Sequence, residues 1–434
     1  MYSLGIDIGT TTLSAVVVDI GSGEVKQKLT IENAEEIPAE DWARLQDPEG
    51  IWNKANDMMC RLLDLYPNIC CIGLAGQMHG ILYTDAEGRS VSPLYTWQDG
   101  RGDILRADGK TYAQSLSAET GRNLATGYGA VTHSYNLEND LVPQNAKWAM
   151  TIHDYVGMKL TGRREPLSHV SNTESFGAPD WAGISSMIRT TDKTECIGTT
   201  NDGIPVAVAI GDNQASFIGS VKDAANSVLI NMGTGGQISM ASGRRPADGG
   251  RSAAGGRSAP SADFEARPYI DSETLLVGFS LCGGQAYALL EKFFREAAVL
   301  AGAPSGRLYE QMNALAEIPV NDPLNVSTLF SGTRRSPELK GSITGISDRN
   351  FTPAHLVQGV LKGMVDELLA HYPKMCERAG RKPKFLIGSG NAIRMNPALR
   401  KLFEEAFNMP MQIPAHQEEA AYGAALFAQK VRPL

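Results

Sequence analysis

Residues 4–11, LGIDIGTT, are an apolar strand that ends in Gly-Thr-Thr, and residues 228–236, VLINMGTGG, repeat this plan. Asn231 follows Asp7 by 224 positions, which is close to half of the 434-residue chain. A strand followed by a glycine turn is common, so a single match would carry little weight. Because the second copy lies near the halfway point, the repeat predicts two similar domains.

Strands and helices alternate along both halves of the chain. Residues 13–20, LSAVVVDI, continue a hairpin with the opening strand. The further expected strands are 69–76, 204–212 and 385–390, and the expected helices are 48–66, 285–302, 351–372 and 418–430. This alternation is typical of a layered α/β protein. We place the domain boundary near residue 220, which divides the chain into 1–220 and 221–434.

Composition and charge exclude several classes of protein. The chain carries 40 Lys and Arg against 48 Asp and Glu, and this charge of −8 argues against a general nucleic-acid binder. No apolar run approaches the length of about 18 residues that spans a bilayer, and the first residues lack the pattern of a secretory signal. None of the six cysteines stands in a CxxC pair, so we expect a reduced, cytoplasmic chain without zinc.

Each copy of the repeat ends in a turn suited to phosphate. The two turns are Asp7-Ile8-Gly9-Thr10-Thr11 and Gly233-Thr234-Gly235-Gly236. Glycine brings backbone N–H groups close to a phosphate, hydroxyls add donors, and an Asp at the end of a strand can hold a divalent cation. The alternative is an ordinary solvent-exposed hairpin turn. Two copies favour phosphate, because facing hairpins would hold one polyphosphate from both sides.

Two segments offer groups suited to a hydroxyl-rich ligand. In GLAGQMHGI, Gln77 and His79 are neutral hydrogen-bonding side chains between glycines. In YTWQDGR, Asp99 and Arg101 can bracket vicinal hydroxyls, and Trp97 offers an apolar face to sugar carbons. The alternatives are a histidine with an internal hydrogen bond and a structural Asp–Arg pair beside a buried Trp.

Asp212, in IGDNQAS, follows a strand and a glycine at the end of the first half. A carboxylate there can take a proton from a hydroxyl whose oxygen attacks phosphorus. It can equally be the N-cap of a helix that begins near Gln214, since Asp favours that position. The sequence leaves both interpretations open.

Residues 243–263, GRRPADGGRSAAGGRSAPSAD, show no apolar period. This composition predicts a mobile solvated loop. Its positive charge gives attraction of a phosphorylated ligand as the alternative.

The order DIGTT, GQMHG, TWQDGR, IHDY, GDNQAS, MGTGG and GSGN resembles the FGGY carbohydrate kinases, from Leu4 to about Ala428. The resemblance implies two actin-like (ribonuclease H-like) domains with the active site in the cleft between them. It also implies ATP as phosphoryl donor and Mg2+ as its cation.

The resemblance further assigns roles by position. Asp212 would be the general base, and Ser14 stands where family members usually carry a basic residue. The phosphate and magnesium end of the cleft would hold Asp7, Thr10 and Thr11, with Asp7 as the metal ligand. The second phosphate turn would be Gly233, Thr234 and Gly235, the adenosine would meet Gly332, Gly388, Ser389 and Asn391, and the sugar would meet Gln77, His79, Trp97, Asp99, Arg101 and Asp212.

We therefore expect ATP-dependent phosphorylation of the terminal hydroxyl of a ketose. Sedoheptulose is the expected substrate and D-xylulose is the alternative. From other classes, a non-catalytic actin-like ATP-binding protein and a sugar sensor remain open. No nucleic-acid or membrane partner is expected, and the sequence leaves a homodimer, regulation and metal preference undecided.

Overall fold

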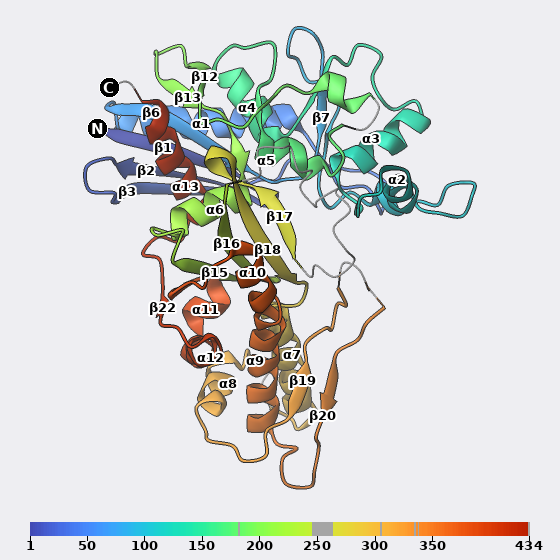
Figure 1. The fold of residues 1–434 in the computed structure, drawn as a ribbon, viewed down its shortest axis with the longest axis vertical. Coiled ribbons are helices and arrows are strands. Elements are labelled where there is room, and N and C mark those ends of the chain that lie inside the picture. The colour runs from blue at the N-terminus through green and yellow to red at the C-terminus, as the bar shows by residue number, and fades with distance from the viewer. Residues whose placement is uncertain (181–182, 245–263, 304–305, 334–335, 337, 433–434) are drawn as a thin grey trace.

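The computed structural model describes residues 1–180, 183–244, 264–303, 306–333, 336 and 338–432. Figure 1 shows two lobes, with both chain ends in the upper lobe and the helices α7, α8 and α9 in the lower lobe. The predicted loop at 243–263 lies outside the described residues, except for its first two positions. Across the described ranges, no helix is long and apolar enough to cross a membrane.

The upper lobe is built on a mixed sheet in the order β12-β13-β6-β1-β2-β3, with β14 also paired to β6. Its strands are β1 (Tyr2–Ile8), β2 (Thr12–Asp19), β3 (Val25–Glu32), β6 (Ile69–Gly76), β12 (Cys196–Thr199), β13 (Pro205–Ala207) and β14 (Ile210–Gly211). The first three strands are antiparallel, while β6 runs parallel to β1. Asp7 thereby lies opposite Ser14 on β2 and Ala75 on β6.

The lower lobe repeats this plan in the order β17-β18-β16-β15-β21-β22. Its strands are β15 (Ser227–Met232), β16 (Gly236–Arg244), β17 (Glu265–Pro268), β18 (Glu273–Ser280), β21 (Phe385–Ser389) and β22 (Met411–Gln412). The β15–β16 hairpin corresponds to β1–β2, and β21 runs parallel to β15 as β6 does to β1. Asn231 lies opposite Gln237 and Ser389, so it occupies the position of Asp7. The duplication expected from the sequence is confirmed.

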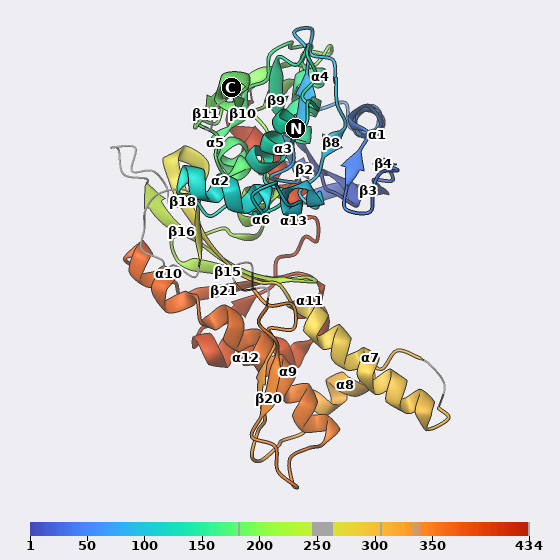
Figure 2. The ribbon, with the colours of Figure 1, turned by 90° about the vertical axis from the view of Figure 1, so that its right-hand side faces the viewer.

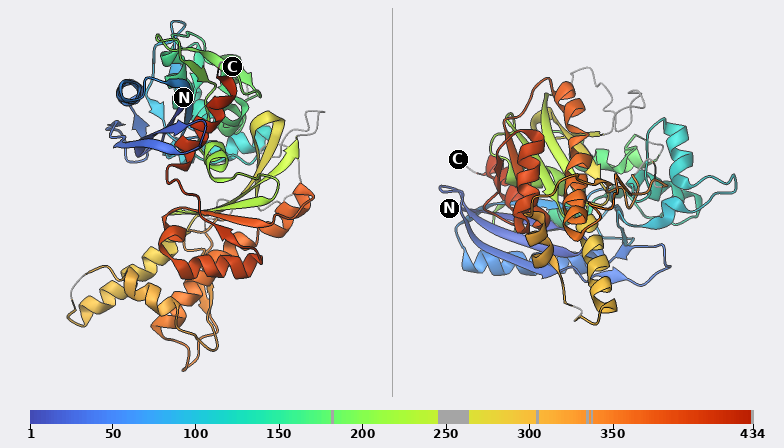
Figure 3. Two further views of the ribbon diagram at one scale, coloured as in Figure 1. Left: turned by 90° about the vertical axis from the view of Figure 1, so that its left-hand side faces the viewer. Right: turned by 90° about the horizontal axis from the view of Figure 1, so that it is seen from below.

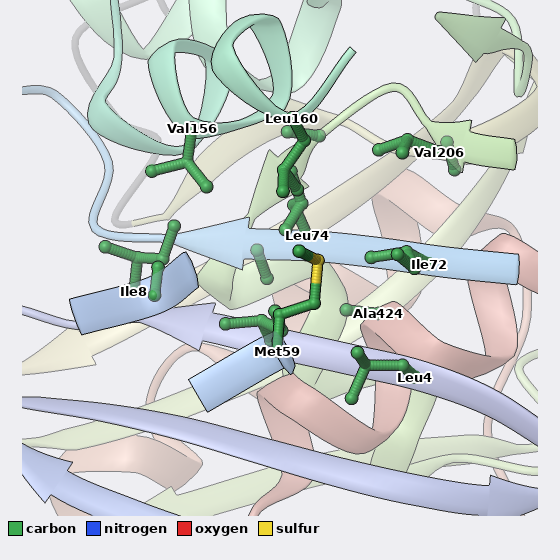
Figure 4. Close-up of a cluster of buried hydrophobic side chains, with 14 of the residues drawn as sticks. Leu4, Ile8, Met59, Ile72, Leu74, Val156, Leu160, Val206 and Ala424 are labelled. Carbon is green, nitrogen blue, oxygen red and sulfur yellow. The ribbon is translucent and has the colours of Figure 1, made fainter. Parts of the chain in front are cut away.

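Alternate faces of each sheet bury different helices. In the upper lobe, Leu4, Ile8 and Leu74 join one apolar core with α1 (Pro48–Leu65) and α4 (Ile152–Leu160), as Figure 4 shows. Asp47 caps α1 by accepting from the Glu49 N–H, and proline follows directly, which is a favoured helix start. In the lower lobe, the outer face of the sheet packs on α7 (Gly284–Leu300), α9 (Pro353–Leu369) and α12 (Pro397–Phe407).

Two helices lie between the sheets, α6 (Asp212–Ser220) and α13 (Glu419–Ala428), at the junction visible in Figure 2. Phe217 of α6 packs on the lower sheet with Leu229. On α13, Gly423 lies so close to α6 that an added Cβ would meet the Ala215 carbonyl oxygen at 1.8 Å. These helices connect the lobes, because α6 is followed by β15 of the lower sheet and α13 is preceded by β22 of the same sheet.

The last helix packs with the first domain rather than the second. Ala424 and Phe427 of α13 belong to the core of the upper sheet, and Figure 3 shows this dark red helix beside the blue N-terminal strands. Packing therefore attaches residues 419–428 of the predicted unit 221–434 to the first domain. The boundary near residue 220 otherwise stays a prediction.

The remaining elements decorate the two lobes. They are β4 (Glu36–Ile37), β5 (Leu45–Gln46), β7 (Leu82–Thr84), β8 (Leu94–Tyr95), α2 (Tyr112–Thr120), α3 (Gly129–Glu138), β9 (Trp148–Met150), β10 (Ser168–His169), α5 (Val170–Thr173), β11 (Thr190–Thr191), α8 (Tyr309–Ala316), β19 (Asn325–Ser327), β20 (Ser342–Thr344), α10 (Tyr372–Ala379) and α11 (Asn391–Met395). The predicted strand 204–212 is interrupted, since β13 and β14 pair separately with β6 and the helix begins at Asp212.

Candidate active site

A cavity of about 1350 Å³ opens between the two domains. The first domain contributes His79, Trp97 and Tyr128 to its lining, and the second contributes Glu265 and Gly332. The cleft expected between the domains is therefore present.

Asp7 lies near the end of β1, on the face of the sheet that looks toward α13. Its carboxyl is half-buried, and its Oδ1 atom is buried without a hydrogen-bond partner among the described residues. Burial, followed by the negative charges of Asp212 and Glu418, raises the pKa of Asp7 to about 8. An acid in this setting is stabilised by a cation.

Asp212 opens α6, but it does not cap it. Gly211 is the N-cap residue, and the Asp212 carboxylate accepts from the N–H of its neighbour Asn213 at 2.6 Å. The N-cap interpretation is therefore wrong. Burial raises the pKa of Asp212, while the Asn213 N–H and the charges of His153 and Arg267 act in the opposite direction. The charge of Asp212 at the start of α6 thus acts on Asp7 at the end of β1, so the two carboxyls belong to one site.

The residues present fit a divalent cation bound together with a polyphosphate. The unpartnered Oδ1 of Asp7 is an oxygen ligand of the kind that Mg2+ prefers. Within the described ranges, no group of three or more His, Cys, Asp or Glu side chains could hold a metal by itself. The ion would therefore keep water and phosphate oxygens as its other ligands, which is usual for Mg2+.

A ring of side-chain hydrogen bonds holds the first glycine-threonine turn. Thr10 Oγ1 donates to Gln77 Oε1 at 3.2 Å, and Gln77 Nε2 donates to Gln46 Oε1 at 3.0 Å. Gln46 Nε2 in turn donates to the Thr10 carbonyl oxygen at 2.8 Å, and Trp97 Nε1 donates to Thr10 Oγ1 at 2.9 Å. Gln77 thus faces the phosphate turn, whereas Trp97 remains 44% exposed in the cleft. Thr11 is exposed at the tip.

His79 is held in a strained backbone conformation, with φ at 73°. Its Nδ1 lies 2.6 Å from the Ser175 carbonyl oxygen, so it carries the proton and donates, and Nε2 can accept from a ligand hydroxyl. The ring stacks on Tyr128 with centroids 4.6 Å apart. Together the two rings form a flat wall of the cleft.

Asp99 and Arg101 are placed differently from the other predicted sugar residues. Asp99 is fully buried and accepts from the Arg101 Nε at 2.5 Å. The Arg101 guanidinium also bonds to Asn136 and lies 4.1 Å from the Tyr95 ring centroid. This pair ties the segment after β8 to α3, and sugar contact by either residue stays a prediction.

The second turn is exposed and rests on the start of α7. Gly284 and Gln285 N–H groups donate to the carbonyl oxygens of Gly233 and Thr234 at 2.9 and 3.0 Å. A Cβ on Gly283 would meet Gly235 at 2.4 Å, so this approach requires glycine. The first N–H groups of α7 are therefore engaged within the protein, where they hold the turn against the start of the helix.

The four residues expected near adenosine are spread over two places. Gly332 lines the cleft with φ at 64°, while Ser389 is buried at the end of β21 and Asn391 begins α11. Gly388 is buried, and a Cβ there would lie 2.6 Å from Met411 Sδ.

Sequence reasoning missed several residues around the two carboxyls. They are Gln46, His153, Glu265, Arg267 and Glu418. His153 is fully buried, with its Nδ1 next to Gly76, and its charge acts on Asp212. His153 belongs to the IHDY motif, but the motif does not show that this side chain packs against the end of β6.

Comparison with known proteins identifies the class of enzyme. The model of the N-terminal domain of the FGGY family of carbohydrate kinases matches residues 2–187, and the model of its C-terminal domain matches 228–430. The chain belongs to the FGGY family of carbohydrate kinases. As a member of this family it is a phosphotransferase that acts on a sugar with ATP as the other substrate.

Individual relatives span nearly all of this FGGY kinase. Sedoheptulokinases from Mus musculus and Homo sapiens are 28% and 27% identical, each covering 98% of the chain and 96% of the relative. The xylulose kinase of Escherichia coli is 23% identical over 90% of the chain and 82% of the relative. The solved xylulose kinase from Rhodospirillum rubrum has the same fold, with a TM-score of 0.81, 21% identity, and coverage of 99% of this chain and 89% of that chain.

Proposed function

We propose that this kinase transfers the γ-phosphoryl group of ATP to the terminal primary hydroxyl of sedoheptulose, giving sedoheptulose 7-phosphate. The choice of sugar is supported by the two sedoheptulokinases, which match over almost their full lengths. The observation that carries the chemistry is the pair of carboxyls, Asp7 near the end of β1 and Asp212 directly after β14, since both strands pair with β6.

Asp212 is the general base in this proposal. Its carboxylate takes the proton of the sugar hydroxyl while that oxygen forms a bond to the γ-phosphorus and ADP departs. A raised pKa suits this role, because a base titrating closer to neutral pH accepts the proton more readily. Mg2+ held by Asp7 would neutralise polyphosphate charge.

The two turns would orient the phosphates from opposite sides. The Thr11 hydroxyl and the backbone N–H groups of Thr10 and Thr11 would donate from the first domain, because the Thr10 hydroxyl already donates to Gln77. Backbone groups of Gly233, Thr234 and Gly235 would donate from the second. The adenosine would lie beside Gly332, Gly388, Ser389 and Asn391. Closure of the domains would exclude water, which otherwise competes as the nucleophile.

The sugar would lie against the first domain. His79 Nε2 accepts from one hydroxyl, Trp97 covers a face of the carbon chain, and Gln77 joins the sugar to the phosphate turn. Asp99 and Arg101 are the remaining predicted sugar residues. They would hold in place the segment that carries Trp97.

Steady-state kinetics with sedoheptulose, D-xylulose, D-ribulose and glycerol tests the substrate. We expect the highest kcat/KM with sedoheptulose. A large preference for D-xylulose would instead support a xylulokinase, for which the Escherichia coli relative provides the precedent.

The two non-enzymatic alternatives have their own test. A sugar kinase should produce ADP faster when its ketose is added, whereas an assembly ATPase or a sugar sensor should not. A cytoplasmic location belongs to this proposal, and size-exclusion measurement would decide the open question of a homodimer.

A further inference from the structure

The second domain contributes a charged pair to the cleft that the assigned roles leave unused. On β17, Arg267 Nε and Nη2 donate to Glu265 Oε2 at 3.0 and 2.8 Å. The guanidinium carbon lies 5.0 Å from the ring centroid of Phe279. Glu265 and Phe279 both line the cavity, and Arg267 behind them is only 8% exposed.

The strand that carries Arg267 is attached to the helix that carries Asp212. Gln214 is fully buried on the first turn of α6, and its Nε2 donates to the Pro268 carbonyl oxygen at 2.9 Å. Pro268 is the neighbour of Arg267, and β17 also contacts α5 of the first domain. This contact across the domain boundary places Arg267 near the start of α6.

The charges of Arg267 and Asp212 act on each other. Burial would lower the pKa of the Arg267 guanidinium, but Glu265, Tyr128 and Asp212 outweigh it and raise that pKa. The positive charge in turn opposes the rise in the pKa of Asp212. The buried guanidinium thus interacts electrostatically with Asp212 as well as with its salt-bridge partner Glu265.

Phosphoryl transfer in this cleft calls for positive charge. The transferring group is anionic, and Asp7, Asp212 and Glu418 add carboxyls around it. The first hairpin cannot balance them, because residues 2–19 contain no lysine or arginine. Ser14, opposite Asp7, is buried and bonded to Thr30 Oγ1 at 3.1 Å.

We propose that Arg267 is a catalytic residue supplied by the second domain, whose guanidinium contacts the phosphoryl group as it passes from ATP to the sugar oxygen. This inference rests on the proposed function and adds a residue to its site. The new oxygen–phosphorus bond forms, the bond to the β–γ bridging oxygen breaks, and the hydroxyl proton goes to Asp212. Arg267 exchanges no proton, and it stabilises negative charge on the equatorial oxygens.

Three substitutions at one position test this role. Arg267→Met removes the charge and keeps most of the stem, and we expect kcat to fall roughly 100-fold with KM for the ketose little changed. Arg267→Lys should recover at least about a tenth of wild-type kcat, since it retains the charge but not the fork. Adding guanidinium ion to Arg267→Ala should raise its rate, which a purely structural arginine would not allow.

Arg381→Met is the matched control in the same domain. Arg381 donates to the carbonyl oxygens of Ala224 and Ala241 at 3.3 and 2.6 Å, so its loss should lower Tm and leave kcat of the folded enzyme unchanged. A folded Arg267→Met enzyme with kcat within about threefold of wild type would overturn the proposal. If that variant fails to fold, absence of both lysine recovery and guanidinium rescue overturns it instead.

The wild-type ketose assay separates this inference from the function on which it rests. Wild-type enzyme that phosphorylates no ketose overturns the proposed substrate class, and binding of ADP with aluminium fluoride then tests Arg267 independently. Weaker binding of this phosphoryl mimic by Arg267→Met than by wild type supports the contact, and equal binding overturns it. An active wild type with unaffected Arg267 variants overturns the contact alone.

Discussion

The two sheets have the same strand plan but carry different side chains at corresponding registers. Where Asp7 pairs with Ala75 in the first sheet, Asn231 pairs with Ser389 in the second. The duplicated geometry therefore gives two similar turns, while the carboxyl at this register belongs to the first sheet. In the proposed function, the duplicated turns would position the phosphates, and the exchange of Asp for Asn would place the cation on the side of the first domain.

A second pair of registers shows how each sheet packs on its inner helix. Gly5 pairs with Gly73 in the first sheet, whereas Leu229 pairs with Ile387 in the second. The two glycines let α13 approach the sheet through its backbone. The two large side chains instead fill the space beneath α6. The same plan thus accepts a close helix on one sheet and a distant one on the other.

The largest expected effect comes from the carboxyl at the start of α6. Asp212→Asn should lower kcat by at least about 100-fold with near-normal ketose binding, because the general base is lost. Turnover and calorimetric ketose titration measure the two quantities. Asp223→Asn, in the exposed turn after α6, is the control and should leave turnover unchanged. Unchanged turnover in Asp212→Asn would remove this residue from the mechanism.

Exchanging charge between the two hairpins tests the comparison directly. Asp7→Asn should lower kcat/KM for ATP by about 100-fold, since the cation ligand is removed. Asn231→Asp should lower it by about tenfold, because a carboxylate would repel the phosphates. Kinetics at several Mg2+ concentrations separates the two causes. Equal losses in both variants would show that the sheets are not specialised.

The packing pairs predict that adding a methyl group to the first sheet and removing one from the second are both destabilising. Gly73→Ala should destabilise by about 2–3 kcal/mol, because the added Cβ would meet the Ala424 carbonyl oxygen at 1.9 Å. Removing a methyl in Ile387→Val should cost about 1 kcal/mol. Gly306→Ala has no neighbour within 4 Å and is the control. Chemical denaturation measures all three, and a neutral Gly73→Ala would contradict the close packing of α13.

The smallest expected effect is a pH-dependent difference in Tm between wild type and Asp7→Asn, measured without ligands. The pKa of Asp7 is about 8 in the folded chain against the ordinary 3.8, so wild type loses stability as pH rises between these values. Asn does not titrate, so the Tm of Asp7→Asn should exceed that of wild type by a gap that widens from pH 5 to 8, reaching a few degrees. A gap that narrows over this interval would contradict the shift.

The sequence revealed most of the fold, because its evidence is local. LGIDIGTT and its copy predicted the duplicated hairpins, and apolar spacing predicted 48–66, 285–302 and 418–430 within two residues of α1, α7 and α13. The place of α13 could not be predicted, since it depends on glycines more than 300 positions away in β1 and β6.

The site was predictable only where residues form a motif. Asp7 and Asp212 end strands, which marks them as candidates. Asp99 and Arg101 stand two positions apart, but the sequence cannot show that they bond to each other and to Asn136. Arg267 follows a segment without pattern, and only the contact of β17 with α6 reveals its place.

The attachment of α13 to the first sheet has a consequence for biosynthesis. Strands β1 and β6 leave the ribosome with Gly5 and Gly73 uncovered, and the helix that shields them is translated more than 300 residues after β6. The first domain therefore cannot complete its folding until α13 has been translated. A message that stops before residue 419 yields a chain in which both halves are present but the earlier one stays exposed to proteases.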